Sequence, residues 1–138
     1  MKKICFVCLG NICRSPMAEF VMREAASDAS LEIASRATSG WEHGNPIHRG
    51  TQGIFRKYKI AYDSSKRSQR ISLADFDWII GMDETNVCDL KRLSQGQFDD
   101  KIFLFIDGGV PDPYYTGDFE ETYHLVEKGC QTWLKKIK

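Results

Sequence analysis

The chain has 138 residues, of which 42% are hydrophobic and 28% charged, and its formal net charge is zero. This length and composition are typical of one globular domain with an ordinary core, so we expect a single catalytic or binding domain over residues 1–138. The neutral charge argues against a general nucleic-acid-binding protein, which would be basic, and no apolar stretch approaches a membrane span. We therefore expect neither nucleic acid nor membrane as a partner.

The N-terminal third alternates between strand and helix patterns. Residues 4–7 are all apolar, which is typical of a parallel strand buried on both faces. After a short loop, Pro16 suits a first helical turn, and apolar residues then follow helical spacing as far as residue 25. Residues 31–38 predict a second strand.

The middle of the chain continues this alternation. Residues 49–57 predict a short helix, and residues 63–69 are polar and expected to be exposed. Residues 76–82 predict a strand with a Trp-Ile-Ile centre. Residues 84–93 then predict a helix with Asp83 as its N-cap.

The C-terminal part completes the pattern. Residues 101–106 predict a fourth strand, residues 107–117 are rich in turn-forming glycine and proline, and residues 119–137 carry one apolar helical face. Strands that alternate with helices predict an α/β fold. We expect a three-layer sandwich in which a central four-stranded, parallel, twisted sheet has helices on both faces.

The most informative segment is the loop between the first strand and the first helix, with the sequence CLGNICRSP. It places Cys8 and Arg14 on either side of five residues. Backbone N–H groups and the helix dipole at such a position attract anions, and they also favour the thiolate form of a cysteine, which is the nucleophile. A guanidinium fork matches a phosphate-like oxyanion. The loop therefore predicts a phosphoryl group held above the Cys8 sulfur.

A phosphoryl transfer from an aryl ester also needs an acid. Ligands of open parallel sheets bind at the carboxyl ends of the strands, where Cys8 and the late glycine- and proline-rich loop both lie. Cys8 would attack, Arg14 and the loop N–H groups would stabilise the charge, and a carboxylic acid would protonate the leaving oxygen. Asp112, between two prolines, is the first candidate for that acid, and Asp83 and Asp107 are its competitors.

The five cysteines are an odd number without the density of a disulfide scaffold, so we expect reduced thiols and a cytoplasmic location. Cys5 and Cys8 form a CxxC pair, but a single pair is a weak zinc signal, and we expect a buried strand residue at Cys5 and no metal. Cys13 is either an ordinary small residue or a redox partner that forms a reversible disulfide with oxidised Cys8. A thiol-redox protein is therefore an alternative.

The loop at residues 8–16, combined with Asp112-Pro113-Tyr114-Tyr115 far downstream, resembles the low-molecular-weight protein tyrosine phosphatase family. The resemblance covers nearly the whole chain and includes residues 37–42, 44–46, 76–77, 82–84 and 86. CX5R by itself occurs in unrelated phosphatases and by chance. CX5RS near the N-terminus with DPYY near the C-terminus is far more specific.

The resemblance implies a cysteine-dependent phosphatase that hydrolyses phosphotyrosine in proteins, and aryl phosphates, through a phosphocysteine intermediate. It makes Cys8 the nucleophile, Arg14 the phosphate clamp and Asp112 the general acid and base. It implies no metal or cofactor, because the arginine and the backbone carry the charge. Tyrosine-phosphorylated proteins would be the partners, and the chain is expected to be a monomer or only weakly self-associating.

The resemblance also implies supporting roles. The phosphate-binding loop would consist of Leu9, Gly10, Asn11, Ile12, Cys13, Arg14 and Ser15. Asn11 would hold the loop's shape with a positive φ, and Ser15 would stabilise the thiolate. Ser35 and Asp83 would support the loop and the arginine from behind. The walls of the substrate cleft would be Ile12, Trp41, Tyr114 and Tyr115.

The chain departs from the family pattern in two places. Many relatives carry a histidine that supports the phosphate loop, where this chain has Ser64 and Ser65, and the stretch at residues 107–111 is short. The chain's own histidines match no catalytic position and are expected to be surface or packing residues: His43, His48 and His124.

Three further functions compete with a tyrosine phosphatase. A protein-arginine phosphatase of the same fold would carry threonine at Ile12, where an apolar side chain favours a phenyl ring over a guanidinium. An arsenate reductase would need more cysteines, and Cys88 has no partner cysteine nearby in the sequence. A phosphotyrosine-binding module without activity would be expected to lose Cys8 or Asp112.

Overall fold

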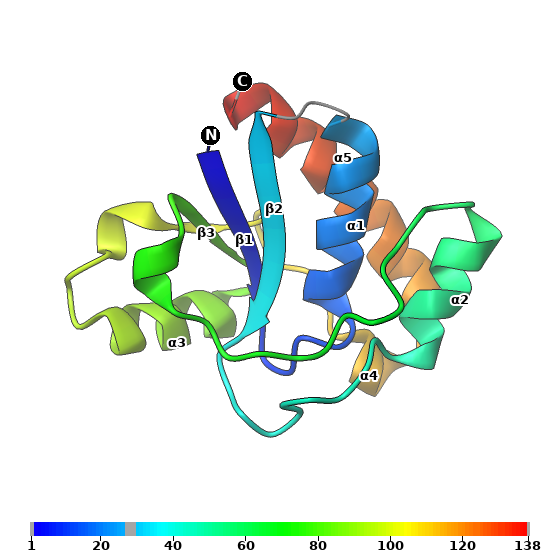
Figure 1. Cartoon of the computed structure of the whole chain (residues 1–138), viewed down its shortest axis with the longest axis horizontal. Helices are drawn as coiled ribbons and strands as arrows, with labels where there is room; N and C mark the ends of the chain where they lie inside the picture. The colour runs from blue at the N-terminus through cyan, green and yellow to red at the C-terminus, as the bar shows by residue number, and fades with distance from the viewer. Residues whose placement is uncertain (1, 27–29, 138) are drawn as a thin grey trace.

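A computed structural model describes residues 2–26 and 30–137 (Figure 1). Its four strands form one sheet in the order β2-β1-β3-β4, and every neighbouring pair is parallel. The strands are β1 (Lys2–Cys8), β2 (Leu31–Ala37), β3 (Trp78–Gly81) and β4 (Ile102–Leu104). The predicted four-stranded parallel sheet is therefore confirmed.

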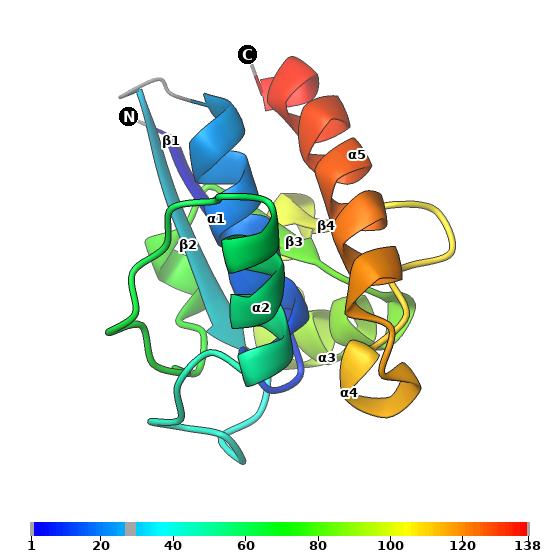
Figure 2. The same cartoon turned by 90° about the vertical axis from the view of Figure 1, so that its right-hand side faces the viewer.

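Helices cover both faces of this sheet, as Figures 1 and 2 show together. On one face lie α1 (Arg14–Ala26), α2 (Arg49–Lys57) and α5 (Phe119–Ile137), and on the other lies α3 (Glu84–Ser94). A one-turn helix, α4 (Pro113–Thr116), precedes α5, and two short 3₁₀ turns span Leu73–Asp75 and Asp99–Lys101. This is the predicted three-layer α/β sandwich.

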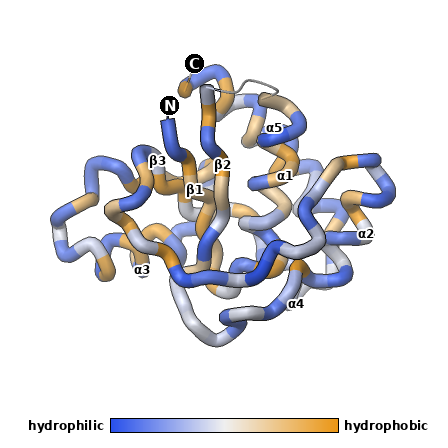
Figure 3. Tube along the Cα trace, viewed as in Figure 1, coloured by the Kyte–Doolittle hydropathy of each residue, from blue (hydrophilic) through white to orange (hydrophobic). Residues whose placement is uncertain are grey.

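Strand β1 divides the core into two. Successive side chains of a strand point to opposite faces, so Ile4 and Phe6 join the cluster beneath α1 and α5, whereas Cys5 and Val7 join the cluster beneath α3. All four side chains are fully buried. Figure 3 shows the corresponding hydrophobic colour along β1 and the inner side of α1. The continuous apolar run at residues 4–7 thus reflects burial on both faces.

Helix α5 packs on the sheet through the apolar stripe that its sequence spacing predicts. Val126, Cys130 and Trp133 are buried, and the Trp133 indole N–H donates to the Phe105 carbonyl oxygen (2.7 Å). A Cβ at Gly129 would lie 2.3 Å from the Phe105 ring, so only glycine permits this close approach.

The prediction that residues 63–69 are exposed is wrong at two positions. Ser68 is buried, and only 11% of the Lys66 side chain is exposed. The reason is tertiary: the segment runs along the end of edge strand β2, where the Ala37 N–H donates to the Gln69 carbonyl (2.7 Å) and the Lys66 ammonium donates to the Ser35 carbonyl (2.8 Å).

The other differences concern the ends of elements. Strands β2, β3 and β4 begin or end one or two residues inside their predicted limits, whereas β1 extends beyond the predicted residues 4–7 at both ends. The predicted turn segment at residues 107–117 contains the single turn of α4. Among the described residues, no helix combines the length and the apolarity needed to cross a membrane.

Candidate active site

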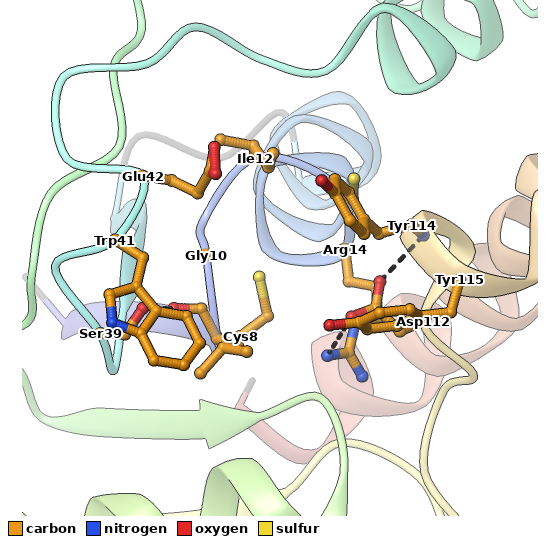
Figure 4. A pocket seen from close by; sticks show the side chains of 12 residues that line it. Cys8, Gly10, Ile12, Arg14, Ser39, Trp41, Glu42, Asp112, Tyr114 and Tyr115 are labelled. Atoms are coloured by element: carbon orange, nitrogen blue, oxygen red, sulfur yellow. Dashed lines mark hydrogen bonds and ion pairs between the residues drawn. The ribbon is translucent and has the colours of Figure 1, made fainter.

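The Cys8 thiol lies at the carboxyl end of β1, beneath the loop that leads to α1 (Figure 4). The Asn11 backbone N–H donates to Cys8 Sγ (3.2 Å), and Ser15 Oγ lies 3.1 Å from the same sulfur. Ser15 Oγ also accepts a hydrogen bond from Asn11 Nδ2 (2.8 Å), which leaves the Ser15 hydroxyl proton free to face the sulfur. Two donors directed at one sulfur stabilise a thiolate.

The carbonyl oxygens of the loop are bound from outside. Backbone N–H groups donate to three of them: that of residue 38 to Cys8, that of residue 39 to Leu9 and that of residue 48 to Ile12. Side-chain hydroxyls also donate: that of residue 39 to Leu9, that of residue 68 to Gly10 and that of residue 51 to Cys13. In a trans peptide the N–H points opposite to the C=O. Outward-facing carbonyls therefore direct the N–H groups of the loop towards its centre, as the binding of an oxyanion requires.

Asn11 and the segment at residues 68–69 hold the loop from behind. Asn11 adopts a φ of 57°, and its side-chain oxygen accepts from the Gln69 N–H (3.2 Å). The Ser68 hydroxyl donates to the Gly10 carbonyl (2.8 Å). Sequence reasoning missed Ser68, because nothing in a polar run distinguishes a buried serine from an exposed one. Ser64 and Ser65, which stand where we expected the supporting histidine to be missing, lie on the surface.

The Ser35 side chain binds helix α1 and not a loop carbonyl. Its hydroxyl is buried and donates to Glu19 Oε1 (2.6 Å) on α1. Glu19 also pairs with Arg23 (2.7 Å), and its side chain is only 4% exposed. Ser35 therefore anchors the helix that carries Arg14 and Ser15, not the loop itself.

Arg14 is the first residue of α1, and its guanidinium is buried at the edge of the pocket. Nη1 donates to Asp83 Oδ2 (2.6 Å) and to the Val110 carbonyl (2.8 Å), while Nη2 lies 3.4 Å from Asp112 Oδ2. Burial alone would lower the pKa of Arg14, but the Cys8 sulfur and the two carboxylates outweigh it and raise the pKa. The cation is thus fixed in charge and in orientation.

The Asp112 side chain points towards the pocket, and each of its two carboxylate oxygens has a partner. Oδ1 accepts from the Tyr114 N–H (3.0 Å) as the N-cap of α4, and Oδ2 faces Arg14. Its competitors are placed differently. Asp83 caps α3 in a capping box and binds Arg14 from outside the pocket, and Asp107 is exposed on its turn. Of the three carboxylates, Asp112 lines the pocket.

The pocket above Cys8 has a volume of about 160 Å³ and aromatic sides. Trp41 lies on one side of Cys8, and Tyr114 and Tyr115 lie on the other (Figure 4). Ile12 lines the pocket as well, and so does Glu42, which the sequence did not single out. The site brings together a thiol, a guanidinium, a carboxylic acid and two walls that fit a flat ring.

The other cysteines and the histidines lie in different surroundings. Burial raises the pKa of the Cys13 thiol well above its usual value, so this group stays protonated although it lines the pocket. Cys5 is fully buried in β1, as predicted. His43 and His124 are on the surface, whereas His48 is half-buried and caps α2.

Known proteins of one family are similar to this chain in fold and in sequence. The model of the family "Low molecular weight phosphotyrosine protein phosphatase" matches residues 3–138. The low molecular weight protein-tyrosine-phosphatase YfkJ of Bacillus subtilis is 41% identical, with 100% of this chain and 97% of that protein covered. PtpA of Staphylococcus epidermidis is also 41% identical, with 99% and 94% covered.

Solved structures agree. The crystal structure of SP-PTP, a low molecular weight protein tyrosine phosphatase from Streptococcus pyogenes, matches with a TM-score of 0.98 and 62% identity, and covers 100% of this chain and 94% of that one. Wzb of Vibrio vulnificus, solved in complex with benzylphosphonate, matches with a TM-score of 0.88 at 25% identity. Sequence, fold and pocket therefore lead to one conclusion: the chain belongs to the low-molecular-weight protein tyrosine phosphatase family and is a protein tyrosine phosphatase.

Proposed function

We propose that the chain hydrolyses phosphotyrosine in proteins in two steps, with Cys8 as nucleophile, Arg14 as phosphate clamp and Asp112 as general acid and base. The observation that carries this proposal is the convergence of these three groups on one pocket, where two donors face the Cys8 sulfur. The whole of residues 1–138 would act as one catalytic domain. It would act as a monomer or with only weak self-association.

In the first step the Cys8 thiolate attacks phosphorus, and the bond between phosphorus and the phenolic oxygen breaks. Asp112 gives its proton to that oxygen, so tyrosine leaves as a neutral phenol. Negative charge on the equatorial oxygens is met by the loop N–H groups and by Arg14, whose position is set by Asp83 and Val110.

In the second step water attacks the phosphorus of phosphocysteine, and the S–P bond breaks. The Asp112 carboxylate accepts a proton from this water, and the thiolate leaves with its electron pair. Inorganic phosphate is released, and both groups return to their starting states. The hydrogen bonds from Ser15 and Asn11 stabilise the leaving thiolate as they do the attacking one.

The shape of the pocket supports an aromatic substrate. Ile12, Trp41 and Tyr115 present apolar surface at the mouth, which suits a phenyl ring better than the short chain of phosphoserine. An apolar Ile12 also disfavours the polar guanidinium of phosphoarginine. We therefore propose phosphotyrosine as the preferred substrate, with phosphoarginine as the alternative.

One comparison tests substrate and nucleophile together. Phosphotyrosine, phosphoserine and phosphoarginine peptides are offered to the protein with a chelator present, and we expect phosphotyrosine to be hydrolysed fastest. Cys8→Ser should abolish turnover while circular dichroism remains unchanged. Cys88→Ser is the matched control, because Cys88 is exposed on α3. Substantial turnover by Cys8→Ser, or a preference for phosphoarginine, would contradict the proposal.

A further inference from the structure

His48 lies at a junction between the phosphate loop and three helices. Its backbone N–H donates to the Ile12 carbonyl (2.9 Å), and its ring Nδ1 accepts from the Gly50 N–H (3.0 Å) as the N-cap of α2. The same ring stacks on Phe119 at the start of α5 (5.2 Å between centroids, 20° between planes). Its edge contact with Tyr114 on α4 (6.1 Å, 75°) connects this junction to the cleft.

The orientation of the His48 ring is fixed from two directions. One face is covered by Phe119, and Nδ1 is bound in the plane of the ring by Gly50. The first turn of α2 also lies hard against Phe119, because a Cβ at Gly50 would be 2.4 Å from that ring. A glycine is therefore needed there, and the imidazole has little freedom to turn.

Tyr114, in contrast, has little support of its own. It belongs to a helix of four residues, which is too short to be stable by its own hydrogen bonds, and the residue is 59% exposed. Within the described part of the chain its ring contacts are with Tyr115 and His48. Tyr115 is itself 77% exposed, so the half-buried, doubly fixed His48 is the firmer of the two supports.

We propose that His48 is a positioning residue that sets the affinity of the cleft for the aromatic ring of the substrate. Its ring holds Tyr114 at the pocket, and its backbone N–H holds Ile12 of the loop. This inference rests on the proposed function, because it takes Tyr114 and Ile12 to be walls of the cleft. Phosphate affinity depends on the loop N–H groups and Arg14, so it should be independent of the His48 side chain.

A wall contacts the phenyl ring equally in the ground state and in the transition state. Loss of such a contact raises KM and leaves kcat nearly unchanged. An edge contact between aromatic rings contributes about 0.5–1.5 kcal/mol, so misplacing the wall should weaken ring binding about 2–10-fold. A group acting in the chemistry would lower kcat instead.

Two substitutions separate the functions of the imidazole. His48→Asn keeps an N-cap acceptor for Gly50 but removes the ring, whereas His48→Phe keeps a ring and removes the acceptor. The probes are benzylphosphonate, which carries an aromatic ring and is not hydrolysed, and inorganic phosphate, which has no ring. Their dissociation constants are measured by calorimetry, and KM and kcat on a phosphotyrosine peptide are measured in parallel.

We expect His48→Asn to bind benzylphosphonate about 2–10-fold more weakly, with a similar rise in KM and with phosphate affinity and Tm close to the wild type. We expect His48→Phe to lose Tm but to bind benzylphosphonate more tightly than His48→Asn does. In a Tyr114→Ala background, His48→Asn should have no further effect on benzylphosphonate. His124→Asn, at an exposed position of α5, controls for the loss of a histidine.

The proposal is overturned if His48→Asn binds benzylphosphonate like the wild type. It is also overturned if its effect persists in full without the Tyr114 ring, or if both ligands weaken in step with Tm in both variants. Failure of the proposed function would be seen differently, as a wild-type protein that does not hydrolyse the phosphotyrosine peptide. The calorimetric result does not depend on turnover, so the two failures can be told apart.

Discussion

Replacing Asp112 separates two roles that one carboxylate performs. Oδ1 caps α4 by accepting from the Tyr114 N–H, and Oδ2 faces Arg14 and the pocket. Asp112→Asn retains an oxygen for the cap but has no proton to give at the leaving group, whereas Asp112→Ala loses both. Loss of an N-cap acceptor costs about 0.5–2 kcal/mol of stability, so the alanine variant should have the lower Tm and the asparagine variant should not.

The catalytic loss should be similar in both variants. General acid catalysis contributes about 10²–10⁴-fold, which is about 2.7–5.4 kcal/mol of activation free energy. We expect kcat/KM on phenyl phosphate, which reports the first step, to fall by this factor, and the loss of kcat/KM on nitrophenyl phosphate to be much smaller, because that leaving group departs without a proton. Steady-state kinetics on both esters, with thermal unfolding of each variant, measures the effect.

Two results would refute this reasoning. An equal loss of kcat/KM on both esters would show that Asp112 acts by holding the pocket's structure and not by protonating the leaving group. An asparagine variant with nearly normal turnover of phenyl phosphate would show that another group is the acid. Asp107→Asn is the matched control, since Asp107 is exposed on the same loop and should not affect turnover.

Three further outcomes follow from the surroundings of single residues. Peroxide should inactivate the protein by oxidising Cys8 to a sulfenic acid. The Cys13 thiol would then form a disulfide with the Cys8 sulfur while its proton leaves with the sulfenic hydroxyl as water, and added thiols would reduce this disulfide. If Cys13→Ser recovers activity as the wild type does, the disulfide is excluded. Ser68→Ala leaves the loop carbonyl that Ser68 binds without its donor, so we expect it to cost about 1–3 kcal/mol of stability and to lower kcat/KM. Urea unfolding and turnover measure the two effects, with Ser64→Ala at an exposed position as the control. Burial raises the pKa of the Cys130 thiol well above its usual value. Above about pH 8.5 the unfolded chain therefore releases a proton that the folded protein keeps. The free energy of unfolding should then fall by up to about 1.4 kcal/mol per pH unit. Urea unfolding at several alkaline pH values should show a shallower fall for Cys130→Ala, and an unchanged slope would contradict this assignment.

Much of the fold could be predicted from the order of apolar runs. The uniform apolarity of residues 4–7 predicts a central strand, and the stripe along residues 119–137 predicts the helix that covers one face. Such patterns are local consequences of burial, because a strand or helix has a fixed period and shows each face to one environment. Residues 63–69 were predicted less well, since their burial at Ser68 comes from pairing with β2, far away in the sequence.

The candidate site divides in the same way. The spacing of Cys8 and Arg14 around a strand-to-helix loop predicted a phosphoryl group above a thiol, and the family resemblance then selected Asp112 as the proposed acid over Asp83 and Asp107. Only the tertiary structure decided which further distant groups support it: Ser68 beneath the loop, and His48 between the loop and Tyr114. These contacts join segments separated by dozens of residues, and a hydrogen bond or ring contact of this kind leaves no periodic trace in the sequence. The reaction limits which residue types can take part in it, so reactive residues can be recognised in the sequence. The residues that support them are determined only by which segments the fold brings together.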